Sequence, residues 1–324
     1  MKIELIEPID VPKSYLMIES LNRLKGQNSA VSISFGDPKQ NFGAKYSFNS
    51  KEIKLFRIAV SDKKEAIDFY EYLDGKVGAF SIDGCDLGTT IDNRFYPFYS
   101  VTEMFEEIET PYFDGSTLKA TLEPLAARIL KGLIEDRPKT CFVLVGYKRW
   151  ELVSQLEFQG FELKFGDLAF STGLPIIIDK LTLEKLVPIV FPIIGLLPFE
   201  WLYPTSDKQY KRQPKCQEEF EWASVIAGDS KYIATHMPER LDGKIIITNA
   251  VTEKDREMFC EAGVEILITT APLLIDCNPD TNLFDAALNI YIGKGNDWTE
   301  KDIYSALSEL EIEPEVYHLQ SVST

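Results

Sequence analysis

Histidine is nearly absent from this sequence, which has only two among 324 residues. His236 falls in a predicted helix and His318 in the last stretch, and neither has a nucleophile or an acid beside it. The five cysteines are scattered without a CxxC pair, so the spacing typical of a zinc site is missing. Walker, GxSxG and HExxH motifs are missing too. We therefore expect no metal centre and assign any proton transfer to Lys or Asp.

Basic residues are also in short supply. Lys and Arg number 34 against 51 Asp and Glu, which gives a formal net charge of −17. A surface this acidic repels phosphate backbones and anionic lipid unless a local basic patch intervenes, and the sequence contains no such patch. We expect a small-molecule ligand, and neither a nucleic-acid nor a membrane partner.

No apolar run is long enough to suggest a membrane span. The most hydrophobic stretch, residues 183 to 203, is interrupted by Pro188, Pro192 and Pro198. It is better interpreted as a buried kinked helix or a lid. The N-terminal stretch MKIELIEPID has no apolar signal core. Together with unpaired cysteines, this predicts a cytoplasmic protein with reduced thiols.

The sequence does contain a regular alternation of strand-like and helix-like segments, which predicts an α/β protein with two lobes. An apolar content of 45% in a chain of this length is typical of two domains. The expected parts are a leading helix within an extension (1–29), a small N-terminal α/β lobe (30–137), a Rossmann-like domain (138–296) with an insert (168–220), and a final helix and tail (297–324).

The strands of the second lobe are continuous apolar runs. Examples are CFVLVG (141–146), KIIITN (244–249) and VEILITT (264–270). Such runs are typical of a parallel sheet that is covered on both faces. With helices between them, they predict a doubly wound sheet in the order 3-2-1-4-5, with ligands gathered at the carboxyl ends of the strands.

The turn after the first of these strands could hold a dinucleotide. Gly146 stands where the pyrophosphate would approach the backbone, and Lys148 could add charge where two further glycines are missing. Asp167 follows 21 positions later, where a ribose-binding acid is expected. The alternative is that Gly146 merely ends a strand and Asp167 caps a turn. The first interpretation implies NAD or NADP as cofactor.

Two later strand ends carry further candidates for cofactor binding, Asn249 and Thr270. Carboxyl ends of neighbouring parallel strands face one crevice, so both side chains could reach the same ligand. Asn249 could equally cap the helix that follows it.

The first lobe supplies the candidate substrate and catalytic residues. Asp114, Ser116, Thr117 and Lys119 stand at the start of a predicted helix, where free N–H groups, hydroxyls and an ammonium suit a polar substrate. Helix capping is the simpler account of the hydroxyls. The loop SIDGCDLGTT adds Asp83 and Asp86 as candidate acid and base, although Asp-Gly pairs also form ordinary turns.

Several longer phrases resemble one family. FELKFGDLAFSTGLPI, LPFEWLYPTSDKQ, DGSTLKATLE and LDGKIIITNAVTEKDREMFCEAGVEILITTAP are similar to bacterial and archaeal Rossmann-type proteins labelled quinate 5-dehydrogenase, over about residues 30 to 292. The resemblance implies NAD(P)-dependent oxidation of a ring hydroxyl of quinate or shikimate. It also implies a first-lobe lysine–aspartate pair, here Lys119 with Asp83, Asp86 or Asp114.

The expected function is therefore an NAD(P)-dependent oxidoreductase with its site in the cleft between the lobes. Lys119 would deprotonate or polarise a substrate hydroxyl, and Asp83 or Asp86 would orient it. The alternative is a non-catalytic protein that keeps the Rossmann-like architecture to bind another small ligand or to assemble, including as a homo-oligomer.

Overall fold

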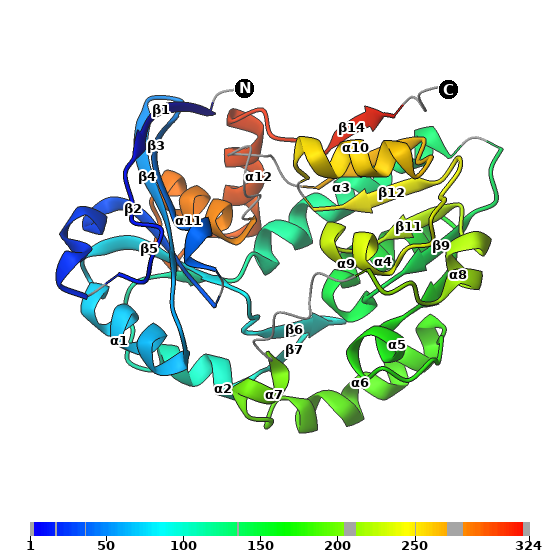
Figure 1. The fold of residues 1–324 in the computed structure, drawn as a ribbon, viewed down its shortest axis with the longest axis horizontal. Coiled ribbons are helices and arrows are strands. Elements are labelled where there is room, and N and C mark those ends of the chain that lie inside the picture. The colour runs from blue at the N-terminus through cyan, green and yellow to red at the C-terminus, as the bar shows by residue number, and fades with distance from the viewer. Residues whose placement is uncertain are drawn as a thin grey trace.

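The computed structural model describes residues 3–16, 18–35, 37–134, 136–203, 212–249, 251–270 and 281–319. Figure 1 shows two sheets, each with its own helices, set side by side. The expected α/β fold with two lobes is confirmed. Among the helices of these residues, none combines the length and the hydropathy that crossing a membrane requires.

The first sheet has six strands in the order β1-β3-β4-β2-β5-β8. Strands β4, β2, β5 and β8 run parallel, while β1 and β3 add antiparallel at one edge. The strands are β1 (Ile3–Ile9), β2 (Gly26–Ser34), β3 (Phe42–Phe48), β4 (Lys51–Ala59), β5 (Val77–Asp83) and β8 (Tyr112–Phe113).

The start of the chain differs from the sequence prediction. In place of a leading α-helix over residues 12 to 25, β1 pairs with β3 and a 3-10 helix, η1 (Ile18–Leu24), follows. Residues 3–9 are therefore part of the first sheet and not an extension. Only Ile3 of this strand is buried, which fits its place at the edge of the sheet.

Helices cover both faces of the first sheet. Alternate residues of the central strands pack against α1 (Lys63–Leu73) on one face and against α11 (Thr281–Ile292) on the other. The lobe also contains α2 (Tyr99–Thr102), α3 (Ser116–Leu133), α12 (Glu300–Glu309), the hairpin β6 (Gly88–Ile91) with β7 (Arg94–Pro97), and the short 3-10 helices η2 (Pro38–Gln40) and η3 (Glu103–Phe105).

The end of the chain returns to the first lobe, which the predicted boundaries did not anticipate. Figure 1 shows α11 and α12, in orange and red, beside the blue strands. Leu283, Phe284 and Leu288 of α11 are buried in the same core cluster as Ala30 and Leu55 of the sheet. The chain then crosses back, because β14 (Glu315–His318) pairs antiparallel with the second sheet.

The second sheet has the order β10-β9-β11-β12-β13-β14. Five strands are parallel, as expected, but their order is 2-1-3-4-5 and not 3-2-1-4-5, because the third strand lies beside the first. The strands are β9 (Thr140–Val143), β10 (Glu162–Phe165), β11 (Val225–Ala227), β12 (Ile245–Thr248) and β13 (Ile266–Thr269). The switch point of this order lies between β9 and β11.

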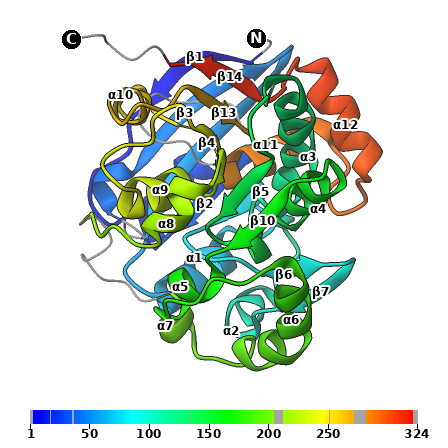
Figure 2. The same cartoon turned by 90° about the vertical axis from the view of Figure 1, so that its right-hand side faces the viewer.

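Helices and connections surround this sheet, as Figure 2 shows from the side. They are the 3-10 helix η4 (Gly146–Arg149), α4 (Trp150–Phe158), α5 (Asp167–Ser171), α6 (Lys180–Ile194), α7 (Phe199–Leu202), α8 (Gln217–Trp222), α9 (Ser230–His236) and α10 (Glu253–Glu261). Helices α5 to α8 lie between β10 and β11, where the insert was expected.

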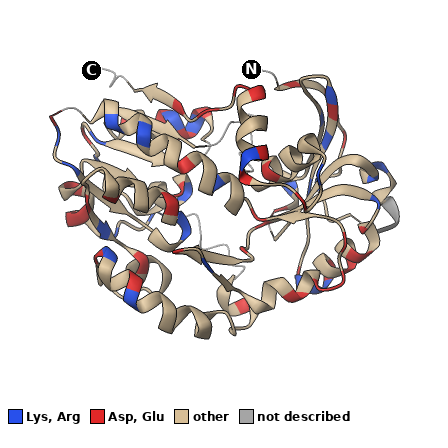
Figure 3. Cartoon of the chain, turned by 180° about the vertical axis from the view of Figure 1, so that it is seen from behind, with Lys and Arg blue, Asp and Glu red and all other residues tan. Residues whose placement is uncertain are grey.

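Helix α6 links the insert to the first lobe. Its buried face includes Phe191, whose ring packs against Tyr96 and Phe98 near the β6–β7 hairpin. The opposite face of α6 carries Ile189 and Ile193 exposed to solvent. Seen from behind, acidic and basic residues are interspersed along both lobes (Figure 3).

Candidate functional site

The turn after β9 is closed by a carboxylate of the protein itself. Asp167, at the start of α5, is 4% exposed. Its Oδ2 accepts the backbone N–H of Gly146 at 2.9 Å, and its Oδ1 accepts that of Tyr147 at 3.1 Å. These N–H groups are the ones that a pyrophosphate would use at this corner. Asp167 therefore does not stand free for a ribose, as the sequence predicted, but takes the place of the anion.

Close packing explains why residue 146 is a glycine. A Cβ at this position would lie 2.4 Å from Cδ1 of Phe165, at the end of β10. The ring of Tyr147 packs edge-on against Phe191 of α6 at 4.9 Å between centroids. Gly146 is thus explained by close contact within the lobe, and the residues of this corner do not fit a pyrophosphate.

The buried surroundings of Asp167 disfavour the ionised form of its carboxyl group. Burial raises its pKa to about 6, although the N–H groups of Gly146 and Tyr147 favour the ionised form. A second anion at the same N–H groups would have to displace this side chain.

Lys148 contacts the opposite lobe. Its Nζ lies 2.6 Å from Oδ2 of Asp86, in the loop after β5. The backbone N–H of Asp86 donates to the hydroxyl oxygen of Tyr203, which follows α7, at 2.9 Å. Asp86 therefore joins the second lobe and the insert to the first lobe, and Lys148 pairs with Asp86 where the sequence predicted a cofactor contact.

Asp86 is kept ionised in this position. Burial opposes its charge, but the ammonium groups of Lys148 and Lys119 outweigh that effect and lower its pKa. The side chain of Lys119, in the first turn of α3, makes no ion pair or hydrogen bond within the described part of the chain. The structure thus brings together two of the predicted catalytic residues, Lys119 and Asp86.

The third predicted catalytic residue is occupied elsewhere. Oδ2 of Asp83 accepts Nε of Arg57 at 3.0 Å, and Nη2 of Arg57 donates to Ser34 at 2.6 Å. Burial opposes the charge of Asp83, but Arg57 and Ser34 lower its pKa. Asp83 therefore belongs to a buried network at the ends of β2, β4 and β5.

The predicted substrate corner is shaped by Asp114. This residue is 4% exposed, and its carboxylate accepts the N–H of Leu87 at 2.9 Å and that of Ser116 at 3.0 Å. Asp114 thus holds the loop before β6 against the first turn of α3. The N-cap of α3 is Gly115, without a side-chain hydrogen bond, so the predicted capping by the hydroxyls of Ser116 or Thr117 was wrong. Ser116 is exposed and Thr117 is half-buried.

Asp285, which was not among the residues predicted from the sequence, lies on α11 behind the same corner. It is 3% exposed and accepts the N–H of Leu118, and its Oδ2 forms no hydrogen bond with any residue that the structure describes. Burial and the nearby Asp114 raise its pKa to about 7. The signal in the sequence was a single acid inside the apolar helix TNLFDAALNIYI. It could be recognised only if α11 was known to pack against α3.

The other strand ends of the second lobe are also satisfied internally. Asn249 accepts the N–H of Ser230 at 3.0 Å and donates to Asp229 at 2.9 Å, so it supports the start of α9. Thr270 is 3% exposed, and its N–H donates to Thr248. In the described ranges, no three His, Cys, Asp or Glu side chains converge as metal ligands would.

Comparison with solved structures finds distant likenesses. An NAD-dependent malic enzyme from Thermotoga maritima is 14% identical, with 90% of this chain and 86% of that chain covered and a TM-score of 0.36. The periplasmic binding protein component of the arabinose ABC transporter from Shewanella sp. ANA-3 is 11% identical, with 87% and 95% covered and a TM-score of 0.34. Likeness at this level carries no information on activity.

No curated protein matches the sequence. Residues 29–114 match the family model described as Domain of unknown function (DUF8753). Residues 117–319, more than half of the chain, match a second model, so the chain belongs to the family described as Domain of unknown function (DUF8754).

Proposed function

We propose that this protein binds a small, hydroxyl-bearing polar molecule between its lobes, beside Lys119 and Asp86. The observation that carries the proposal is Lys119, an ammonium with no ion pair within the described residues, next to an ionised aspartate. A cation and an anion in one polar corner can together orient a hydroxyl or a carboxylate. Lys148 supplies a second cation from the opposite lobe.

Phosphate groups are a poor match for the adjoining second lobe. Asp167 already accepts the N–H groups of Gly146 and Tyr147, and Asp229 and Asn249 accept those at the start of α9. An added phosphate would meet carboxylates where it needs donors. A ligand without phosphate is therefore favoured, which supports the small-ligand alternative of the sequence analysis.

An NAD(P)-dependent oxidoreductase is the second candidate. It is favoured by the proximity of Lys119 and Asp86, because removing a proton from a hydroxyl needs a base and a group that orients it. It is opposed by Asp167, so NAD or NADP would have to bind without the N–H groups of Gly146. The resemblance to quinate 5-dehydrogenases makes quinate and shikimate the first ligands to test.

A thermal-shift titration with quinate, shikimate, NAD and NADP separates the two candidates. A shift of the melting temperature by a few degrees with quinate or shikimate, abolished in Lys119→Met, would support ligand binding at this corner. Lys131→Met, an exposed lysine later on α3, is the matched control and should keep the shift.

The same titration can also contradict each of the two candidate functions. An equal shift in Lys119→Met and wild type would place the ligand elsewhere. No shift with NAD or NADP at saturating concentration would remove the oxidoreductase candidate and leave the binding proposal intact.

A further inference from the structure

A row of polar side chains crosses the first sheet at the opposite end of its strands from Asp83. Ser29 of β2 lies opposite Lys54 of β4, and Lys54 lies opposite Lys45 of β3. Residues directly opposite one another in neighbouring strands share a face of the sheet. The three side chains therefore form one continuous line on the face that α1 covers further along.

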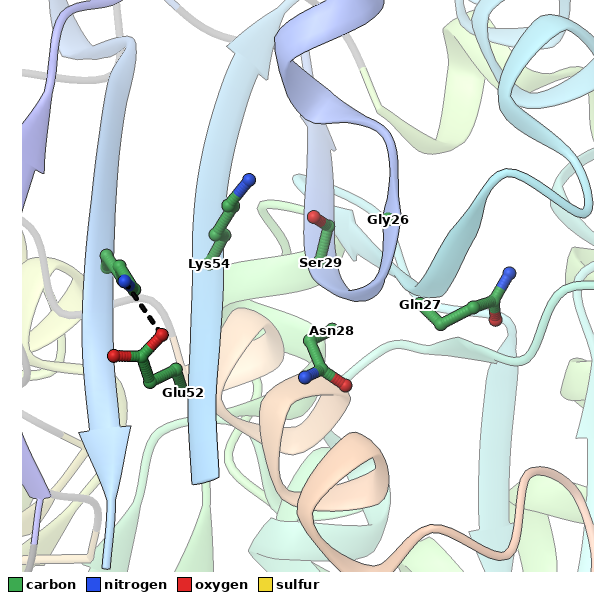
Figure 4. Close-up of a pocket in the computed structure, with 7 residues that line it drawn as sticks. Gly26, Gln27, Asn28, Ser29, Glu52 and Lys54 are labelled. Atoms are coloured by element: carbon green, nitrogen blue, oxygen red, sulfur yellow. Dashed lines mark ion pairs between the residues drawn. The ribbon is translucent and has the colours of Figure 1, made fainter. Parts of the chain in front are cut away.

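This line borders a cavity of about 400 Å³ that Figure 4 shows in close-up. The next residues on the same face, Val31 and Phe56, are fully buried in the core. The sheet therefore changes from buried apolar residues to an open polar row within two residues of each strand. A volume of this size is in the range that binds small molecules, which begins at about 300 Å³.

A bulge in β2 opens the cavity. Gly26 pairs with Val77 and Ala30 with Ala79, so residues 27–29 of β2 stand against Gly78 alone. A Cβ on Gly78 would lie 2.0 Å from the carbonyl oxygen of Gln27, so this arrangement requires glycine. The extra residues bend β2 away from the ladder and place Asn28 and Ser29 at the cavity.

Two side chains of this cavity have no protein partner among the described residues. The Ser29 hydroxyl is buried, with the residue 1% exposed, and none of these residues forms a hydrogen bond with it. The ammonium of Lys54 forms no ion pair or hydrogen bond within the same part of the chain. Buried hydroxyls normally have a partner, so an unsatisfied one beside an unpaired ammonium suggests a missing ligand atom. Figure 4 shows these side chains projecting from neighbouring strands.

The charge of the cavity favours an anion. Lys45 and Lys54 contribute two ammonium groups, and Glu52 contributes one carboxylate, which pairs with Lys45 at 2.7 Å. Lys45 also faces Glu7, which lies opposite it on β1, so Lys54 is the ammonium among the lining residues that is left to meet an anion. Lysine binds phosphate as a point charge, and amides such as those of Gln27 and Asn28 bind hydroxyls.

We propose that this cavity is a second ligand site, which takes a small phosphate monoester with a hydroxylated body, such as a sugar phosphate. Lys54 and the Ser29 hydroxyl hold the phosphate, and Gln27 and Asn28 contact the body. The site is independent of the corner around Lys119. Ser29 and Ser34 are five residues apart on β2, so the cavity lies about 16 Å from Ser34 at the carboxyl end of that strand.

Isothermal titration calorimetry of the full chain with glucose 6-phosphate tests the proposal. Inorganic phosphate, AMP and glucose are titrated in parallel, to separate the contribution of the phosphate group to binding from that of the rest of the ligand. We expect saturable binding of glucose 6-phosphate, weaker binding of inorganic phosphate and none of glucose. Lys54→Met should weaken binding by about tenfold or more, because a charge-assisted hydrogen bond is lost.

Two further variants exclude a general effect on folding. Glu52→Gln removes the carboxylate among the described residues that line the cavity and should tighten binding, the opposite of what a damaged fold would do. Lys64→Met removes an exposed lysine of α1 outside the cavity and should change nothing. Tighter binding of AMP than of glucose 6-phosphate would contradict the proposal that the phosphate is carried by a simple sugar. Absence of binding by every phosphate, or equal affinity in wild type and Lys54→Met, would overturn the site.

Discussion

The carboxylate of Asp167 accepts the backbone N–H of Gly146 at 2.9 Å and so fills the corner where a dinucleotide-binding fold would place its pyrophosphate. The glycine and the acid that suggested a cofactor in the sequence therefore bind each other. The two residues are 21 positions apart in the sequence. Because β9 and β10 are neighbouring parallel strands, the residues that follow their carboxyl ends lie side by side.

The first prediction concerns the pH dependence that Asp167 contributes. Its pKa is raised from 3.8 to about 6 by burial, so the folded state binds the proton more tightly than the unfolded state. The stability that this carboxyl contributes is fully present below about pH 4 and is lost as the pH rises through about 6. The loss is about 3 kcal/mol at about 1.4 kcal/mol per pH unit.

Urea denaturation of wild type and Asp167→Asn between pH 4 and 8 measures this contribution, since asparagine does not titrate. The free energy of unfolding of wild type relative to the variant should fall over that range. A difference that stays constant with pH would show that Asp167 does not change its protonation in this window.

The second prediction concerns Asp285. Its pKa of about 7 means that it is protonated at pH 5 and ionised at pH 8, with an unpartnered oxygen in the core. Asp285→Asn keeps an acceptor for the N–H of Leu118 and carries no charge. The variant should match or exceed the stability of wild type at pH 8 and lose that advantage at pH 5. Thermal unfolding of wild type and Asp285→Asn at both pH values tests this prediction. A larger stability advantage of the variant at pH 5 than at pH 8 would contradict the raised pKa of Asp285.

The third prediction concerns the glycine of the turn. Gly146→Ala should destabilise the fold by about 1–3 kcal/mol, because the added methyl overlaps Phe165. Gly132→Ala, in α3 with nothing within 4 Å of the added carbon, is the control and should stabilise by about 0.5–1 kcal/mol. Chemical denaturation of both variants measures the contrast. Equal effects would mean that the corner can relax around a side chain.

The fourth prediction concerns the ion pair between the lobes. Lys148 and Asp86 are 2.6 Å apart, but the Lys148 side chain is 42% exposed, so solvent screens the interaction. A double-mutant cycle with Lys148→Met and Asp86→Asn should give a coupling of about 1 kcal/mol at neutral pH. Because the pKa of Asp86 is lowered, the coupling should disappear on acidification through that value. A coupling that persists at pH 2 would mean that the pair contributes through packing and not through charge.

The sequence by itself determined the elements and the class of fold. Runs such as KIIITN and VEILITT became the parallel strands β12 and β13 because only a sheet covered on both faces buries every residue of such a run. Thr252, of a residue type that favours the N-cap position, caps α10 through a capping box with Asp255. These features depend on residues that are close together in the chain, so the sequence alone is enough to predict them.

Only the tertiary structure decided which elements lie together and what the polar residues contact. The strand order, the return of α11 to the first sheet and the pairing of Asp86 with Lys148 join separate parts of the sequence, and Asp86 and Lys148 alone are 62 positions apart. Such pairings depend on how whole faces pack, and many arrangements satisfy the same local pattern. For that reason the sequence placed Asp167 at the correct corner but could not show that its partner was the protein's own backbone.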